Sequence, residues 1–194
     1  MSWYELLLFA HISMAVIWVG GATMVQFFAL RAIRAPDPMR MAEFGEDIEW
    51  SANRTLIPAS GLAFVTGVLL VIDSDFWGFG DDWIVIGLAL FAITFLAGIL
   101  FFGPESGRLS KLAESEGPAS PVFQARLQRM LALTRADLML LFLLIFDMAT
   151  KPSWGDPSLW VAIAGFAVLA AILVRNGLNA KIASATAEPI RQPA

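Results

Sequence analysis

Long apolar runs separated by short polar segments dominate the pattern of the chain. The clearest run extends from Trp83 to Phe102 and contains no charged residue. An α-helix rises about 1.5 Å per residue, so roughly 20 such residues span the hydrocarbon core of a bilayer. A helix in a soluble core would instead show polar residues at every third or fourth position on its outer face. This run therefore predicts a transmembrane helix.

Four further runs have the same character, and together the five predict an all-α fold, a polytopic transmembrane helix bundle of about five helices. The fourth run is interrupted by Arg135, Asp137 and Asp147, and an amphipathic stretch that begins at Pro121 precedes it. The first run lacks a basic segment before it and is too long for a signal peptide, so we expect it to be retained. A single integral membrane domain is expected over residues 1–194, with helices at about 3–30, 56–73, 83–103, 133–150 and 158–175.

Basic residues are confined to alternate connections between these runs. Of the 13 lysines and arginines, only Lys151 lies in a connection on the opposite side. Loops rich in lysine and arginine stay in the cytoplasm, so the pattern predicts an N-terminus outside and a C-terminus inside. The expected location is a bacterial cytoplasmic (inner) membrane, crossed several times. Aromatic residues that favour the membrane–water interface mark the predicted outer side: Trp3, Tyr4, Trp77, Trp83, Trp154 and Trp160.

Composition agrees with a membrane protein and excludes several kinds of chemistry. The chain is 58% hydrophobic and 15% charged, whereas soluble domains carry about 25% charged residues. A formal net charge of -4, without a long basic tract, gives no reason to expect nucleic acid as a partner; the expected partner is the lipid bilayer. Because the chain has no cysteine, disulfides, thiolate metal sites and cysteine nucleophiles are excluded. One histidine is also too few for a conventional zinc site.

That histidine, His11, lies within the first predicted helix. Counted from Trp3, it is about 12 Å below the outer boundary of the membrane. A polar ring is costly in lipid and usually faces the interior of a bundle together with a partner. His11 is therefore either a hydrogen-bonded core residue or a ligand of a metal or haem. Met14 and Trp18 follow on the same helical face, a pattern that by itself predicts packing.

Small residues on the first two helices indicate close approach of neighbouring groups. Gly20 and Gly21 permit another helix, or a flat ligand, to come near the backbone. Ala59, Ala63 and Gly67 form a ridge of small residues at helical spacing on the second predicted helix. This ridge predicts helix packing.

Acidic residues on the fourth predicted helix are the other candidates for chemistry. Asp147 lies about 6 Å from the helix end at Lys151, at a depth similar to that of His11. Two interpretations remain open: Asp147 orients the His11 ring, or it only pairs with Lys151 one turn away. Nearer the inner boundary, Asp137 and Arg135 are expected to form a structural ion pair.

Three segments of the chain resemble a known family. The segments ELLLFAHISMAVIWVGG, RTLIPASGLAFVTGVLLV and FDMATKP are similar to DUF2269, an uncharacterised bacterial family of integral membrane proteins, over about residues 4–153. More distantly, the chain resembles the HemJ-type protoporphyrinogen oxidases and the CopD copper-resistance membrane proteins. The positions that match the HemJ-type pattern are His11, Trp18 with Gly20, Arg54 with Leu56 and Pro58, and Lys151 with Pro152.

The HemJ-type resemblance implies haem b as a cofactor, because the first-helix histidine of that group is taken to bind it. It makes His11 the expected axial and metal ligand. The third-helix lysine that follows a tryptophan in HemJ-type proteins is missing, since Trp83 is followed by IVIGL. Whether the chain is an enzyme therefore stays open. The expected cofactor-binding residues are His11, Met148, Trp18, Gly20, Gly21, Asp147 and Arg54.

The favoured function is thus a haem-b-associated integral membrane protein that takes part in electron transfer or porphyrin handling. A homodimer or a larger membrane complex is left open. One alternative is a CopD-like copper transporter or permease, since thioethers such as that of Met14 suit Cu(I). A second alternative is a noncatalytic accessory or assembly subunit, whose polar residues only specify packing.

Overall fold

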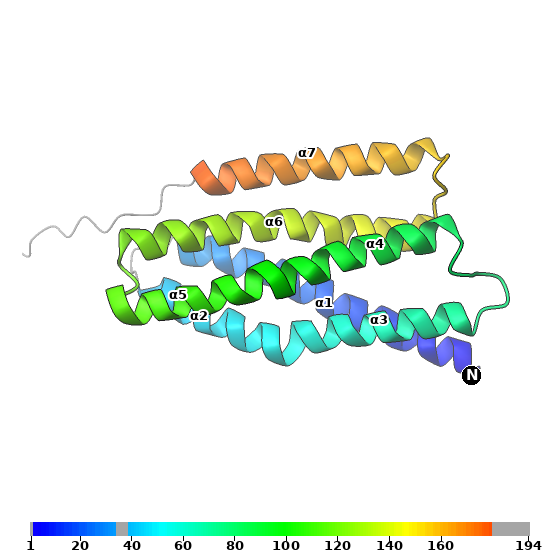
Figure 1. The fold of residues 1–194 in the computed structure, drawn as a ribbon, viewed down its shortest axis with the longest axis horizontal. Helices are drawn as coiled ribbons and strands as arrows, with labels where there is room; N and C mark the ends of the chain where they lie inside the picture. The colour runs from blue at the N-terminus through cyan, green and yellow to red at the C-terminus, as the bar shows by residue number, and fades with distance from the viewer. Residues whose placement is uncertain (1, 34–38, 180–194) are drawn as a thin grey trace, which may run out of the picture.

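The computed structural model describes residues 2–33 and 39–179, which form five long helical rods (Figure 1). The predicted all-α class is confirmed, and the described residues contain no strand. Two of the rods combine α-helices with a short π-helical segment. The rods are α1 (Trp3–Ile33); α2 (Met39–Ser51) with η1 (Ala52–Leu56) and α3 (Ile57–Ile72); α4 (Asp82–Ala97) with η2 (Gly98–Phe102) and α5 (Gly103–Glu116); α6 (Pro121–Thr150); and α7 (Pro157–Asn179).

Both π-helical segments are followed by a proline. Pro58 follows η1 at the start of α3, and Pro104 follows η2 at the start of α5. Proline has no N–H to donate and its ring collides with the carbonyl four residues earlier in a regular α-helix. A π-helical turn widens the backbone at that point. The wider turn lets each rod continue through its proline.

Four of the rods are long and apolar enough to cross a membrane, and they extend over Trp3–Ala32, Glu43–Ile72, Asp82–Glu116 and Pro157–Asn179. The fifth, α6, is equally long but carries Arg135, Asp137 and Asp147 within its apolar half. It is also the helix on which the others gather, because α1, α4, α5 and α7 all pack against it. These neighbours surround the polar side chains of α6.

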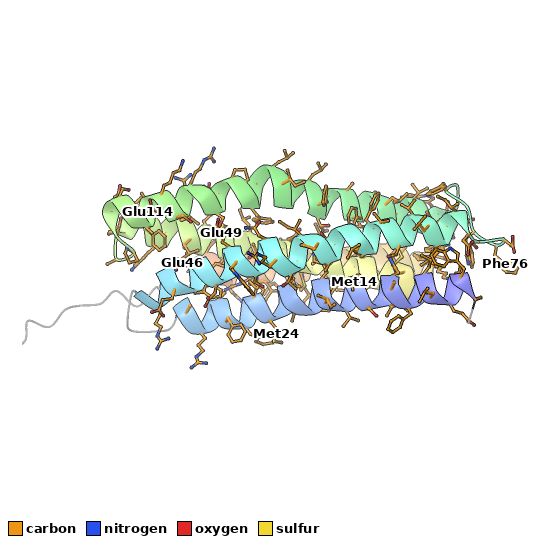
Figure 2. The ribbon with its side chains drawn as sticks, turned by 90° about the horizontal axis from the view of Figure 1, so that it is seen from below. Met14, Met24, Glu46, Glu49, Phe76 and Glu114 are labelled. Atoms are coloured by element: carbon orange, nitrogen blue, oxygen red, sulfur yellow. The ribbon has the colours of Figure 1, made fainter. Side chains whose placement is uncertain are left out.

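The two ends of the bundle differ in composition. The start of α1, the α3–α4 connection and the α6–α7 connection lie at one end (Figure 1). We call it the Trp-rich end, after Trp3, Trp77, Trp83, Trp154 and Trp160. At its tip, Phe76 projects away from the bundle and is 87% exposed (Figure 2). The end of α1, α2, α5, the start of α6 and the end of α7 form the opposite, Arg-rich end.

The helices are longer at the Arg-rich end than the sequence predicted. The stretch before the second apolar run and the stretch after the third were expected to be connections. Both are helical, as α2 and α5 respectively. Their residues are mostly good helix formers, and an established helix extends at little further cost. Helix α1, with 31 residues, is about 46 Å long and exceeds the roughly 30 Å of a hydrocarbon core.

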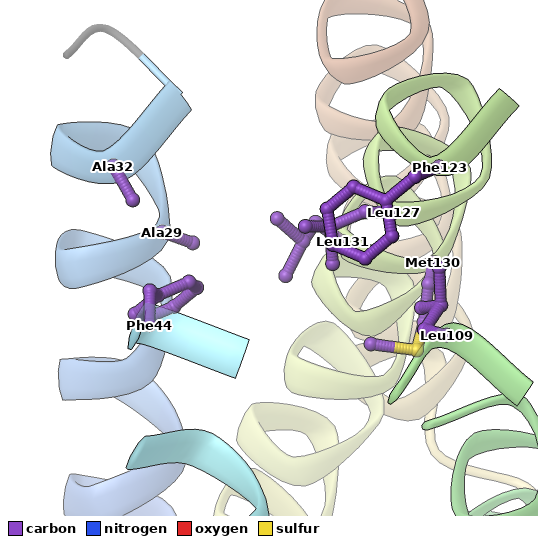
Figure 3. Close-up of a cluster of buried hydrophobic side chains, with 8 residues drawn as sticks. All are labelled: Ala29, Ala32, Phe44, Leu109, Phe123, Leu127, Met130 and Leu131. Carbon is purple, nitrogen blue, oxygen red and sulfur yellow. The ribbon is translucent and has the colours of Figure 1, made fainter. Parts of the chain in front are cut away.

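A hydrophobic cluster joins α1, α2, α5 and α6 at the Arg-rich end (Figure 3). Glu105 of α5, largely buried, adds an ion pair with Arg126 of α6, which binds it through both Nε and Nη2. This end therefore has a core of the kind found in soluble helical proteins. The buried members of the cluster are Ala29, Ala32, Phe44, Leu109, Phe123, Leu127, Met130 and Leu131.

Candidate functional site

His11 projects from α1 onto the backbone of α3. Its Nδ1 lies 2.8 Å from the carbonyl oxygen of Ala63. A carbonyl only accepts, so Nδ1 carries the proton and donates it to Ala63. The hydroxyl of Thr66, 3.4 Å from Nδ1, donates to the carbonyl of Leu62 at 2.7 Å. The α3 backbone thus fixes the tautomer and the orientation of the imidazole.

The other ring nitrogen of His11 is left for a different partner. In a neutral imidazole with a protonated Nδ1, Nε2 bears the free lone pair. No described residue forms a hydrogen bond with Nε2. The ring is half-buried. This arrangement is the one found for histidines that ligate metals, where a backbone carbonyl or carboxylate holds the nitrogen opposite the metal.

Gly67 makes room for the ring. A Cβ at this position would lie 2.9 Å from His11 Cε1 and 3.2 Å from Nδ1. The glycine ends the ridge of small residues on α3, of which Ala59 and Ala63 are each 4% exposed. The predicted packing role of the ridge is seen in its contact with α1. Its glycine also receives the side chain of His11.

Trp18, Gly20, Gly21 and Arg54 do not gather around His11. The Trp18 ring meets Phe91 of α4 edge to face, with centroids 5.7 Å apart. Gly20 is exposed, with open space where a Cβ would be. A Cβ at Gly21 would lie 2.6 Å from Leu56 Cδ2, so this glycine serves helix packing. Arg54 is exposed and lines an open hollow near the Arg-rich end with Glu46, Glu49, Trp50 and Asn53.

Asp147 and Met148 pack against α4. A Cβ on Gly87 would lie 3.0 Å from Asp147 Oδ2 and 2.3 Å from Met148 Cε. Neither residue forms a described contact with His11, whose Nδ1 is held by Ala63. The hydrogen bond to His11 that one interpretation of Asp147 required is therefore absent from the described residues. Asp147 is fully buried, and both of its carboxyl oxygens lack a described hydrogen-bond partner.

The alternative pairing of Asp147 with Lys151 is also absent from the described part of the chain. Lys151 ends α6 in a left-handed conformation, with φ 48°. Its ammonium lies over the rings of Trp77 and Trp83, 4.4 and 5.1 Å from their centroids. Cation–π attraction at these distances stabilises the ammonium away from the carboxyl group.

The ion pair expected between Arg135 and Asp137 does not occur either among the residues described. Arg135 is buried and its Nη1 donates to the carbonyl of Leu173 on α7 at 3.2 Å. Asp137 lies beside an apolar hollow between α4–η2 and α6, and its Oδ1 has no described partner. Residues two apart on a helix point about 200° away from each other. The two side chains therefore face different neighbours.

The partners of His11 were the part of the site that sequence reasoning missed. A backbone carbonyl such as that of Ala63 has no sequence signature, and Thr66 lies on an ordinary apolar helix. The one available signal was Gly67, at the end of the small-residue ridge. No group of three or more His, Cys, Asp or Glu that could hold a metal ion occurs in the described residues.

Comparison with known proteins identifies one related family. The profile of the family described as "Predicted integral membrane protein (DUF2269)" matches residues 5–152. The curated proteins gave no match, and neither did the solved structures.

Proposed function

The chain belongs to the family Predicted integral membrane protein (DUF2269), and we propose that it is a haem-b-associated protein in which His11 is an axial ligand. Because the family consists of integral membrane proteins, any chemistry of the chain takes place in or beside a membrane helix bundle. When bound, haem b supplies one-electron chemistry. The role proposed for the chain is electron transfer or porphyrin handling. The residues that would hold the iron and its surroundings belong to α1, α3 and α4.

The single observation that carries the proposal is the hydrogen bond from His11 Nδ1 to the Ala63 carbonyl, 2.8 Å long. This bond leaves the lone pair on Nε2 and limits rotation of the ring. A polarised Nδ1–H also raises the basicity of Nε2 toward a metal. An imidazole that only satisfied a polar position in the bundle would gain more from partners at both nitrogens.

An aromatic cluster formed by α1, α3 and α4 is the apolar surface on which we propose that the macrocycle rests. The ring centroids of Phe64 on α3 and Phe91 on α4 lie 4.8 Å apart in a stacked pair, and Trp18 on α1 meets Phe91 edge to face. Such surfaces exclude water from a bound porphyrin. Because His11 is the only histidine, bis-histidine ligation would need a second copy of the chain. A single copy of the chain would hold the haem through one histidine, His11.

The proposal is tested by the haem content of the purified protein. Wild type, His11→Ala and Ser13→Ala are expressed with haem supplied, purified in mild detergent and compared by absorption spectrum and haem assay. Ser13 is a half-buried polar residue of the same helix, so its variant controls for general disturbance of α1. We expect a Soret band in wild type and Ser13→Ala and none in His11→Ala. Equal Soret bands in all three proteins, or none in wild type, would refute the proposal.

A further inference from the structure

A buried acid on the central helix has no hydrogen-bond partner among the described residues and no part in the proposed haem site. Asp147 is 0% exposed, and neither Oδ1 nor Oδ2 receives a hydrogen bond from a described residue. Its Oδ2 lies against α4, where Gly87 leaves the space that a Cβ would fill. One turn earlier on α4, the buried Nε1 of Trp83 likewise has no described partner. The α4–α6 contact therefore holds a carboxyl group without a described partner, and α4 carries a buried donor without a described partner one turn before Gly87.

No charged group on the elements around Asp147 forms a described hydrogen bond or ion pair with its carboxyl group. On its own helix, the Lys151 ammonium is held over Trp77 and Trp83. On α4, Asp82 accepts the backbone N–H of Trp154 at 3.0 Å. Helix α7 carries no charged residue before Arg175. The first half of α1 carries three titratable groups. His11 donates to the carbonyl of Ala63, Glu5 accepts from the N–H of Ser2, and the third is Tyr4. The connections add four acids: Asp73, Asp75, Asp81 and Asp156.

An ionised carboxylate is poorly tolerated in such a place. Removing a charge from water without a counter-charge costs several kcal/mol, and the lack of hydrogen bonds adds to that cost. A hard metal cation would need about six oxygen ligands, and the described residues include no group of three or more His, Cys, Asp or Glu that could hold one. A proton needs only one carboxyl oxygen. The chemistry of the site therefore selects a proton over a metal ion.

We propose that Asp147 is a proton-binding site that exchanges protons with the aqueous phase at the Trp-rich end, and that Lys151 replaces the proton as counter-cation. When the proton leaves, the O–H bond of the carboxyl group breaks, the electron pair stays on Asp147 and a water molecule at the rim takes the proton. The ammonium of Lys151, whose backbone N–H already bonds to the Asp147 carbonyl at 2.8 Å, then moves from the two indole rings to the carboxylate. Re-protonation returns it to the rings.

Infrared spectroscopy tests the first half of the proposal without any cofactor. Difference spectra between acidic and alkaline pH are recorded for the whole protein in lipid nanodiscs, for wild type and for Asp147→Asn, Asp147→Glu and Asp75→Asn. Asp75 lies on the exposed α3–α4 connection and provides the matched control. We expect a carbonyl-stretch band of a buried carboxylic acid, sensitive to deuteration, in wild type and Asp75→Asn. The band is expected to be lost in Asp147→Asn and displaced in Asp147→Glu.

Tryptophan emission tests the second half. Movement of Lys151 away from Trp77 and Trp83 is expected to change their fluorescence at the same pH at which the infrared band disappears. This change should be absent from Asp147→Asn and from Lys151→Met. If the buried-acid band persists in Asp147→Asn and is unmoved in a folded Asp147→Glu protein, Asp147 is not the proton site. An emission change that survives in Lys151→Met would overturn the role of Lys151.

Discussion

At the scale of single residues, the orientation of His11 depends on a few atoms of α3. The Ala63 carbonyl accepts the Nδ1 proton at 2.8 Å, and Gly67 leaves the space that the ring occupies. Both contacts come from backbone atoms or from a missing side chain, so they are rigid. The free Nε2 is a consequence of this arrangement. Small substitutions on α3 should therefore change the orientation of the His11 ring although they alter no polar side chain.

Gly67→Ala tests that dependence. The added Cβ would lie 2.9 Å from His11 Cε1, so the ring must move and its bond to Ala63 weakens. If haem binds at His11, we expect its retention to fall by about 10- to 100-fold, as for other groups that orient a ligand. Haem titration of the purified protein gives the measurement. The control is Gly61→Ala on the same helix, where a Cβ meets nothing within 4 Å; equal retention in both variants would contradict the positioning role.

At the scale of the helices, the central position of α6 follows from its polar residues. The apolar sequence of this helix is interrupted by Arg135, Asp137 and Asp147. The structure surrounds this helix with α1, α4, α5 and α7, because intramembrane polar side chains face protein rather than lipid. Peripheral α7, in contrast, was easy to predict from its unbroken apolar sequence and packs mainly on α6.

The contact between α6 and α7 depends on a glycine. A Cβ at Gly177 would lie 3.0 Å from Ala132 Cβ and 2.5 Å from Arg135 Nη1. Since neither the short Ala132 nor the buried Arg135 can move freely, we expect Gly177→Ala to lower the free energy of unfolding by about 1–3 kcal/mol. Gly165→Ala on the same helix, in open space, should be neutral or stabilising by up to about 1 kcal/mol. Reversible unfolding in mixed SDS and mild-detergent micelles gives both values, and equal stabilities would contradict the packing shown by α7.

The helices could be predicted from the sequence, whereas the pairings between their side chains could not. Runs such as Trp83–Phe102 carry a strong apolar signal, so the helices and their approximate places were accessible. Depth along a helix is also calculable, and it put His11 and Asp147 at similar levels. The rotation of each helix about its own axis cannot be calculated from the sequence. That rotation directs His11 to α3 and Asp147 to α4. That difference directs His11 and Asp147 to different neighbours, so neither of the two interpretations of Asp147 that the sequence left open is found in the described residues.

At the scale of the whole molecule, the charge distribution predicts an orientation in the membrane. Among the described residues, every lysine and arginine except Lys151 lies in the half of the bundle nearer the Arg-rich end. Glu46, Glu49 and Glu114 also lie toward this end (Figure 2), but acidic residues contribute little to topology. We therefore expect the Arg-rich end to face the cytoplasm of a bacterial inner membrane.

Reporter fusions test this orientation. A reporter fused after Ala194 should give a cytoplasmic signal, and one inserted near Gly80, in the α3–α4 connection, should give a periplasmic signal. A fusion after Gly117, in the turn between α5 and α6, serves as a second cytoplasmic position. A periplasmic signal at the C-terminus would contradict both the orientation and the odd number of crossings.

Ligation by His11 is tested most directly by chemical rescue. His11→Gly removes the imidazole and leaves its space against Gly67, which free imidazole in solution can enter. We predict that this variant is purified folded but without a Soret band, and that haem together with imidazole restores the band at the wild-type position. Ethylimidazole, which is bulkier, should restore less. A full Soret band in His11→Gly without imidazole, or a haem-free variant that imidazole fails to rescue while wild type binds haem, would contradict ligation through His11 Nε2.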